Sequence, residues 1–188
     1  MKIPLEVSAR HCHLSQSDLD ILFGKNYKLQ KIKDLSQPGQ FAAVQTVTIL
    51  GPKGKIERVR VLGPLRSKTQ VEISKTDGFI LGVLPPLRIS GDLVGSAGIR
   101  ILGPKSEINL KEGLIVAWRH LHCSPQEAKN LGIKNSDLIS VKAEGERGLV
   151  FANIVVRVDK NFRLACQLDT DEANAAGVRQ GDFGILIK

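Results

Sequence analysis

All four histidines of the chain occur in two near-copies of one hexapeptide, "RHCHLS" at 10–15 and "RHLHCS" at 119–124. In a β-strand, residues i and i+2 point to the same face, roughly 7 Å apart, so each His-x-His pair can bring two imidazoles to one metal ion. A single pair is a weak signal, because such a pair is more often only a polar strand face. Two copies that use every histidine predict metal binding, and their separation in the sequence predicts a split active site.

Two histidines leave a zinc ion short of ligands, since catalytic zinc sites typically use three protein donors and an open position. Carboxylates are the expected additional donors. The candidates are Glu72 in "TQVEIS" and the acidic cluster Asp169, Asp171 and Glu172 in "LDTDEANAAG". A lone Glu in a strand usually faces solvent, and acidic residues in a first helical turn usually interact with the helix dipole. Composition therefore leaves the choice of carboxylate open.

The segment "GPLRSKTQ" at 63–70 places an Arg, a Lys and two hydroxyls directly after a Gly-Pro turn. The guanidinium of Arg66 can bind a phosphate oxyanion through two parallel hydrogen bonds, which a Lys ammonium cannot do. The segment is thus either an anion site or an ordinary surface loop.

The charge balance is compatible with an anionic partner. The chain carries 27 basic and 19 acidic side chains and a net charge of +8, which suits a nucleotide-containing cofactor, phosphate or nucleic acid. Aromatic residues make up only 4%, with one Trp and one Tyr, whereas a stacking platform for single-stranded nucleic acid usually has more. We therefore expect no nucleic-acid partner, and we interpret the basic stretch "KNYKLQKIK" at 25–33 as a solvated face.

The hydropathy of the chain and the pattern at its start indicate where the protein is found. No apolar run approaches the roughly eighteen residues that a membrane helix needs, so we expect no membrane partner. The start, "MKIPLEVSA", shows no leader pattern, which favours a cytoplasmic protein.

Three cysteines, Cys12, Cys123 and Cys166, are an odd number, which argues against a disulfide framework. Two of them stand beside the histidines, and we expect them to pack as small apolar groups on the opposite strand face.

Short strands separated by Gly and Pro dominate the pattern and predict a mainly β fold, a barrel or a sandwich. The segments rich in β-branched residues are "FAAVQTVTIL", "KIERVRVL", "TQVEISK", "AGIRIL", "GLIVAW", "DLISVKA", "GLVFANIVVRV", "FRLACQL" and "DFGILI". Three of the strands end in the same turn chemistry, "ILGP", "VLGP" and "ILGP" at 49–52, 61–64 and 101–104.

Three short helices are expected between the strands. The predicted spans are 16–23 with Ser15 as N-cap, 125–131 with a capping box from Ser124 to Glu127, and 171–176 with Thr170 as N-cap. The last two belong to a weak internal repeat, because "EAKNLGIKNSD" at 127–137 matches "EANAAGVRQGD" at 172–182. The repeat predicts a helix, a tight turn and a strand that begins at Asp, a unit that caps a small barrel.

Five motifs together resemble one known family. They are "VSARHCHLS", "LGPLRSKTQVEIS", "SGDLVGSAGIRILGP", "WRHLHCSPQEAKNLG" and "LDTDEANAAG", and they occur in the order found in the PduL-type phosphotransacylases, the phosphate propanoyltransferase family. The resemblance covers essentially the whole chain. It implies an acyltransferase that interconverts an acyl-CoA, such as propanoyl-CoA or acetyl-CoA, and phosphate with an acyl phosphate and CoA. It also implies two zinc ions, a homodimer, and two small β-barrels with short capping α-helices and the active site between the barrels.

The resemblance implies roles for individual residues and for segments. The first zinc is expected on His11, His13 and Glu72, the second on His120 and His122, and phosphate on the catalytic Arg66; Ser8, Lys33, Arg60 and Asn174 match positions that line the CoA pocket. The first barrel is expected to comprise about residues 10–117. The N-terminal strand, 1–9, is expected to complete a second barrel formed by residues 118–188.

Two departures from the family pattern matter. Gln167 stands where the family has a third histidine on the second metal, and its neutral amide oxygen is a poorer zinc donor than imidazole. We therefore expect the second ion to bind more weakly. The N-terminal extension of microcompartment members is not seen, which favours a cytosolic enzyme. Two alternatives stay open: a catalytically weakened CoA-binding protein, with Gln167 as the mark of decay, and a zinc-dependent thioester hydrolase on the same scaffold.

Overall fold

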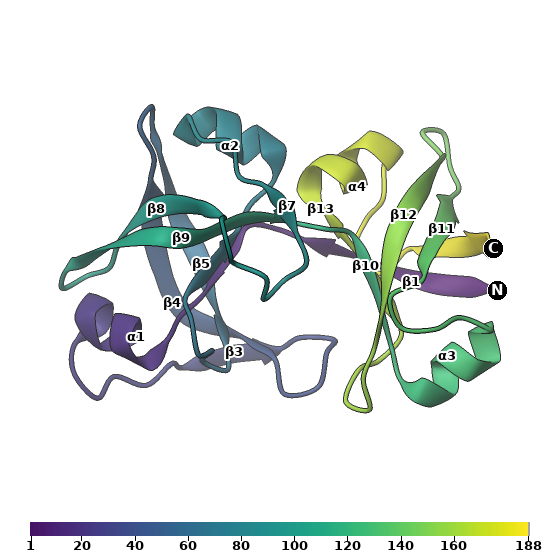
Figure 1. The fold of residues 1–188 in the computed structure, drawn as a ribbon, viewed down its shortest axis with the longest axis horizontal. Coiled ribbons are helices and arrows are strands. Elements are labelled where there is room, and N and C mark those ends of the chain that lie inside the picture. Colours follow the sequence, from purple (N-terminus) through teal and green to yellow (C-terminus); the bar gives the residue numbers. More distant parts are fainter. Residues whose placement is uncertain (188) are drawn as a thin grey trace. The chain divides into compact units, whose positions relative to one another are not determined.

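The computed structural model describes residues 1–187, and these form fourteen strands and four short helices (Figure 1). The chain divides into two compact units. The first, here the terminal barrel, comprises Met1–Ala9, Ser36–Pro38 and the chain from Trp118 onward; the second, here the central barrel, comprises Arg10–Leu35 and Gly39–Ala117. The mainly β class with two small barrels and capping helices, predicted from the sequence, is confirmed. An active site between the barrels stays a prediction.

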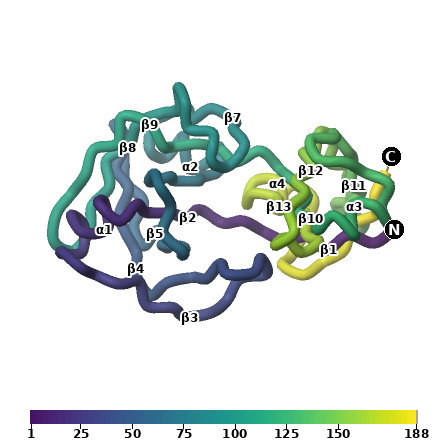
Figure 2. The backbone as a smooth tube through the Cα atoms, turned by 60° about the horizontal axis from the view of Figure 1, so that its bottom comes forward, coloured from purple at the N-terminus to yellow at the C-terminus, as the bar shows by residue number. Residues whose placement is uncertain are grey.

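The terminal barrel is a closed ring of six strands in the order β1-β13-β10-β12-β11-β14. Its elements are β1 (Lys2–Ser8), β10 (His120–Cys123), α3 (Pro125–Leu131), β11 (Leu138–Ala143), β12 (Leu149–Val158), β13 (Ala165–Asp169), α4 (Thr170–Ala176) and β14 (Phe183–Ile187). β1 pairs with β13 on one side and with β14 on the other, so the first and the last strand lie side by side (Figure 2). The first strand thus closes a ring that is otherwise built from the last third of the chain.

The central barrel is also closed. β4, β5, β2, β6, β9 and β8 pair in that order, β8 returns to β4, and β3 and β7 add to the edges of β4 and β9. Its elements are β2 (His11–His13), α1 (Gln16–Phe23), β3 (Lys31–Asp34), β4 (Phe41–Leu50), β5 (Lys55–Gly63), β6 (Gln70–Glu72), α2 (Lys75–Leu81), β7 (Leu87–Arg88), β8 (Ala97–Leu102) and β9 (Glu107–Ala117). α1 and α2 lie on opposite sides of this barrel in Figure 1.

Side chains alternate between the two faces of each strand, and those on one face, including the three cysteines, fill the cores of the two barrels. Cys12 packs in the core of the central barrel, and Cys123 and Cys166 pack in the core of the terminal barrel. Burial raises the pKa of the Cys123 thiol to about 11, with a smaller contribution from the Glu127 carboxylate. The predicted role of Cys12 and Cys123 as small apolar groups on the strand face opposite the histidines is confirmed.

The predicted helix signals are confirmed, with one correction and one omission. Ser15 and Ser124 cap α1 and α3, the latter in a capping box with Glu127. The cap of α4 is Asp169, not Thr170, because the Asp169 carboxylate accepts from the backbone N–H of Glu172. Helix α2 was not predicted, although Ser74 and Asp77 form a capping box and Gly82 ends the helix in the left-handed region.

The internal repeat is confirmed at the level of single hydrogen bonds. The carboxylate of Asp137 accepts from the backbone N–H of Lys134 at 2.7 Å, and that of Asp182 accepts from the backbone N–H of Arg179, also at 2.7 Å. In each copy the helix ends at a glycine and the next strand begins one residue after the aspartate. None of the helices within residues 1–187 combines the length and the hydropathy of a transmembrane span.

Candidate active site

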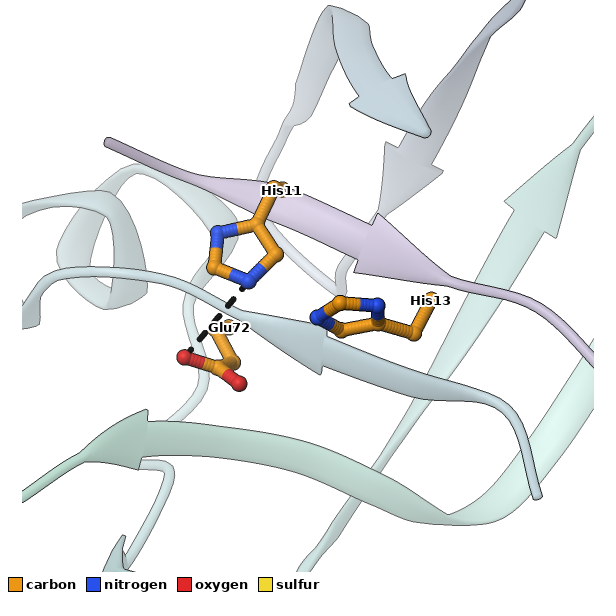
Figure 3. Close-up of side chains that lie close together, drawn as sticks. All are labelled: His11, His13 and Glu72. Atoms are coloured by element: carbon orange, nitrogen blue, oxygen red, sulfur yellow. Dashed lines mark ion pairs between the residues drawn. The ribbon is translucent and has the colours of Figure 1, made fainter. Parts of the chain in front are cut away.

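Strand register brings His11, His13 and Glu72 together in the central barrel. β2 runs antiparallel to β6, and the pairing sets His11 opposite Glu72, while His13 lies two residues further along the same face. One nitrogen or oxygen atom of each of the three side chains lies within 4.8 Å of the others, and His11 Nε2 is 3.6 Å from Glu72 Oε2 (Figure 3). Within residues 1–187, no other set of three His, Cys, Asp or Glu side chains brings such donors so close.

The charge states of these groups suit a metal ion. All three residues are buried, with 7%, 3% and 7% of their surface exposed. Burial opposes ionisation of Glu72, but His11, His13 and the Ser90 hydroxyl outweigh it and hold the pKa of the carboxyl well below its usual range. Burial lowers the pKa of His13, and the nearby His11 and Arg66 lower it further. An ionised carboxylate beside a neutral imidazole is the donor form that a metal ion requires, so the residues fit the implied zinc.

A serine that sequence analysis missed connects Arg66 to this triad. Ser90 Oγ accepts a hydrogen bond from Arg66 Nη1 at 3.1 Å and from Gln70 Nε2 at 2.9 Å, and it donates to Glu72 Oε1 at 2.8 Å. A hydroxyl has one donor and two acceptor positions, so these three bonds use all of them. One hydroxyl group thereby links the guanidinium to a candidate metal ligand, and phosphate binding by Arg66 stays a prediction.

Gln70 is the second residue of this network that the sequence analysis missed. Its amide nitrogen also donates to Glu72 Oε1, and its carbonyl oxygen accepts from the backbone N–H of Gly91 at 2.8 Å. Gln70 precedes Glu72 by two residues in a strand, so shared orientation was a signal for it. Ser90 lies in the quoted motif "SGDLVGSAGIRILGP", but its type and position indicated no role.

The second histidine pair lies on β10 of the terminal barrel. His120 and His122 are both buried, and their ring centroids are 4.5 Å apart. The backbone carbonyl of Trp118 lies 2.7 Å from His120 Nδ1, and a carbonyl can only accept, so Nδ1 carries the proton. In the neutral form of the ring, Nε2 is then the nitrogen without a proton, the atom through which such an imidazole can bind a metal. The ring of Phe162 lies against His122, with centroids 4.1 Å apart.

Gln167 lies beside this pair. It is opposite His120 in the β10–β13 pairing and opposite Glu6 in the β1–β13 pairing, and its amide nitrogen donates to Glu6 Oε2. No pattern in the sequence indicated a role for Glu6. The neighbouring Cys166 points into the barrel core, where burial, followed by the Glu172 carboxylate, raises the pKa of its thiol to about 12. As expected from strand alternation, Cys166 does not face the histidines.

The acidic cluster Asp169, Asp171 and Glu172, which the sequence left open as a source of metal ligands, lies at the N-terminus of α4. Asp169 and Glu172 cap the helix reciprocally, with hydrogen bonds of 2.8 and 3.0 Å, and Asp171 lies in its first turn. Glu172 also lies 3.3 Å from Arg119 Nε. Glu72 is therefore the carboxylate that the structure brings to a histidine pair.

The four residues expected to line a CoA pocket are divided between the units. Ser8 ends β1 and Asn174 is exposed on α4, whereas Lys33 is exposed on β3 and Arg60 lies on β5. The Arg60 guanidinium donates to the backbone carbonyls of Ala43 and Val44 at 3.0 and 2.8 Å. Binding of CoA by these four residues stays a prediction.

Comparison with known proteins gives a consistent result. Residues 4–179 match the family model described as phosphate propanoyltransferase. The chain is 52% identical to a phosphate propanoyltransferase of Thermotoga maritima over 183 residues, which covers 97% of this chain and 87% of the relative. It is 54% identical to one from Priestia megaterium, covering 98% and 85% of the two chains, and 53% identical to one from Salmonella typhimurium, covering 93% and 83%. The chain belongs to the phosphate propanoyltransferase family.

Proposed function

We propose that this protein transfers an acyl group, propanoyl or acetyl, between CoA and inorganic phosphate. The family is one of transferases, and the observation that carries the proposal for this chain is the hydrogen-bonded connection from Arg66 through Ser90 to Glu72. This connection holds the Arg66 guanidinium, a group that binds phosphate, beside buried side chains that can hold a metal ion. A metal ion bound there would polarise the carbonyl group of the substrate.

His11, His13 and Glu72 would hold a zinc ion, and His120 and His122 a second one. A zinc ion at such a site supplies a Lewis acid that stabilises negative charge developing on the thioester oxygen. The protein's own contribution is to keep the His13 imidazole neutral by burial and the Glu72 carboxylate ionised. Both side chains are then in the form that binds a metal ion rather than a proton.

Arg66 would bind and orient phosphate for attack on the acyl carbon. A phosphate oxygen forms the new bond to this carbon, the carbon–sulfur bond breaks, and CoA leaves as its thiolate. Phosphate is already an anion at neutral pH, so the attack requires no separate general base. This agrees with a chain whose four histidines all lie in the two His-x-His motifs.

The net charge of +8 suits CoA, whose pyrophosphate and ribose phosphate are anionic. We propose Ser8, Lys33, Arg60 and Asn174 as contacts for this substrate. The apparent affinity for acyl-CoA should then fall as the salt concentration rises, because mobile ions screen such attractions. A Michaelis constant for acyl-CoA that is unchanged between low and high ionic strength would count against charge-assisted binding. The homodimer and the cytoplasmic location are part of the same proposal.

One assay separates the proposed transferase from the two alternatives. Acetyl-CoA and propanoyl-CoA are incubated with the zinc-loaded protein, with and without inorganic phosphate, and the release of free thiol is followed. We expect release that depends on phosphate, together with formation of acyl phosphate. Release without phosphate would indicate a thioester hydrolase, and binding of CoA without any release would indicate a binding protein; either result contradicts the proposal.

A further inference from the structure

We propose that Glu6 is a positioning residue for the second metal site. Its carboxylate holds the Gln167 amide so that the carbonyl oxygen, Oε1, turns toward His120 and His122 and serves as the third protein donor. The inference rests on the proposed function for the presence of a second ion. It assigns a donor to the position at which this chain departs from the family pattern, and an outer partner to that donor.

Strand register places the four side chains on one face of the terminal barrel. Glu6 and Gln167 are direct partners across β1 and β13, and Gln167 and His120 are direct partners across β13 and β10. Directly paired residues share a face, and adjacent strands are about 4.8 Å apart, so the three form a row with Gln167 in the middle. His122, two residues beyond His120, points the same way. The alternate residues Leu5, Cys166 and Leu121 fill the barrel core on the other face.

The hydrogen bond to Glu6 determines which end of the Gln167 amide faces which neighbour. A carboxylate only accepts hydrogen bonds, so the amide atom next to Glu6 Oε2 must be the NH₂ group. Because the nitrogen faces Glu6 on β1, the amide oxygen is the atom left to face β10, which pairs with β13 on its other side and carries the histidines. The nitrogen and oxygen of a glutamine amide are usually assigned from their hydrogen bonds, and here the bond to the carboxylate distinguishes them.

The Glu6 carboxylate is itself held in place. Ser36 Oγ donates to the same carboxylate oxygen at 2.6 Å. The backbone around Ser36 is anchored in turn, because the neighbouring Gln37 side chain exchanges two hydrogen bonds with the backbone of Arg163, at 3.0 and 3.2 Å. This explains why the short segment Ser36–Pro38 belongs to the terminal barrel although the chain on both sides of it belongs to the central one.

The arrangement strengthens an otherwise weak donor. A neutral amide oxygen is a poorer zinc ligand than imidazole, but donation from its NH₂ group to an anion shifts electron density toward the oxygen. Outer partners of this kind typically contribute 10- to 100-fold to metal affinity. His120 has an equivalent partner in the Trp118 carbonyl, so two donors of the proposed site are oriented in the same manner.

The test measures metal binding, not activity. Zinc content is determined by elemental analysis after equilibration of the full chain at a series of buffered free zinc concentrations. His122→Ala defines which ion belongs to the second site. Glu6→Gln keeps the size of the side chain but removes its charge and its obligatory acceptor. Glu146→Gln makes the same change at an exposed site of the same barrel and serves as the matched control.

We expect Glu6→Gln to weaken the second ion by 10- to 100-fold, with the first ion and the Glu146→Gln control unchanged. In a Gln167→Leu background the same Glu6→Gln change should have no further effect, because Glu6 acts through the amide. A second ion bound equally well by Glu6→Gln, or a Glu6 effect that persists in Gln167→Leu, would overturn the inference. So would the absence of any zinc that His122→Ala removes. Failure of the proposed function is detected separately, as absence of phosphate-dependent thiol release from the unmodified protein.

Discussion

Arg66 and Glu72 are joined through a single hydroxyl group, since Ser90 Oγ lies 3.1 Å from Arg66 Nη1 and 2.8 Å from Glu72 Oε1. The hydroxyl accepts from the cation and donates to the anion, so each bond is charge-assisted. The relationship couples the position of the proposed phosphate ligand to that of the proposed metal ligand. A substitution of Ser90 can therefore shift the Arg66 or Glu72 side chain while both residues remain in the protein.

Replacement of Ser90 by Ala should raise the Michaelis constant for phosphate about tenfold, while metal content stays near that of the unmodified protein. The guanidinium would lose one hydrogen bond that orients it, and loss of a charge-assisted bond typically costs about 1.5–3 kcal/mol before relaxation. Steady-state kinetics at varied phosphate and elemental analysis provide the two readouts. Ser106→Ala, at an exposed position of the same barrel, is the control. An unchanged Michaelis constant would show that Ser90 does not position Arg66.

Arg66→Ala should reduce turnover by about a hundredfold or more, because removing an oriented cation from a developing anion typically costs about 3–4 kcal/mol. Arg66→Lys should restore little of it, since an ammonium cannot reproduce the bidentate fork. Both variants should keep their zinc. Turnover near that of the unmodified protein in Arg66→Ala would remove this residue from the catalytic site.

His11→Ala and His13→Ala should each lose zinc and activity together and remain folded. The barrel core is formed by side chains on the opposite strand faces, such as Cys12 and Val71, so the fold does not depend on either imidazole. Metal analysis and circular dichroism are to be measured on the same samples. Full metal content in either variant would show that the first site is misassigned, and loss of the circular dichroism signal would indicate a structural zinc instead.

Local signals in the sequence predicted much of the fold and the two histidine pairs, but not the residues around them. The His-x-His spacing and the caps at Ser15 and Ser124 depend on neighbours within four residues, and these features are confirmed. Ser90 and Glu6 depend on pairings between distant segments, and no local pattern distinguishes them from other polar residues. The choice of Glu72 among four carboxylates came from family resemblance, because only the β2–β6 register sets it opposite His11.

Acidification should destabilise the metal-free protein in two stages. The pKa of His13 is lowered in the folded state by burial, so below the ordinary histidine pKa of 6.5 the unfolded chain binds a proton that the folded chain does not. The pKa of Glu72 is also lowered in the folded state, so below the ordinary glutamate pKa of 4.5 the unfolded chain again binds a proton that the folded chain does not. Both terms make the free energy of unfolding fall as the pH falls.

Urea denaturation in the presence of a chelator, at intervals from about pH 7.5 to pH 4, measures this dependence. His13→Gln should flatten the upper part of the profile, near the unfolded-state pKa of histidine of about 6.5, and leave the lower part in place. Zinc should shift the loss of stability to lower pH, because metal and protons compete for the same donors. A profile of His13→Gln parallel to that of the unmodified protein would contradict the buried, neutral state of this imidazole.

Gln167→His should raise the zinc content after mild chelation. Imidazole is a stronger zinc donor than an amide oxygen, even one polarised by Glu6, so the unmodified protein should hold its second ion more weakly than its first. Both proteins are loaded with zinc, dialysed identically against a weak chelator and analysed for metal. We expect Gln167→His to approach two ions per chain and the unmodified protein to retain fewer. Glu6 remains beside position 167 in the variant and can accept from the second ring nitrogen, so the new ligand inherits an outer partner. Two tightly held ions in the unmodified protein would instead mean that the Gln167 oxygen, oriented by Glu6, equals a histidine as a ligand.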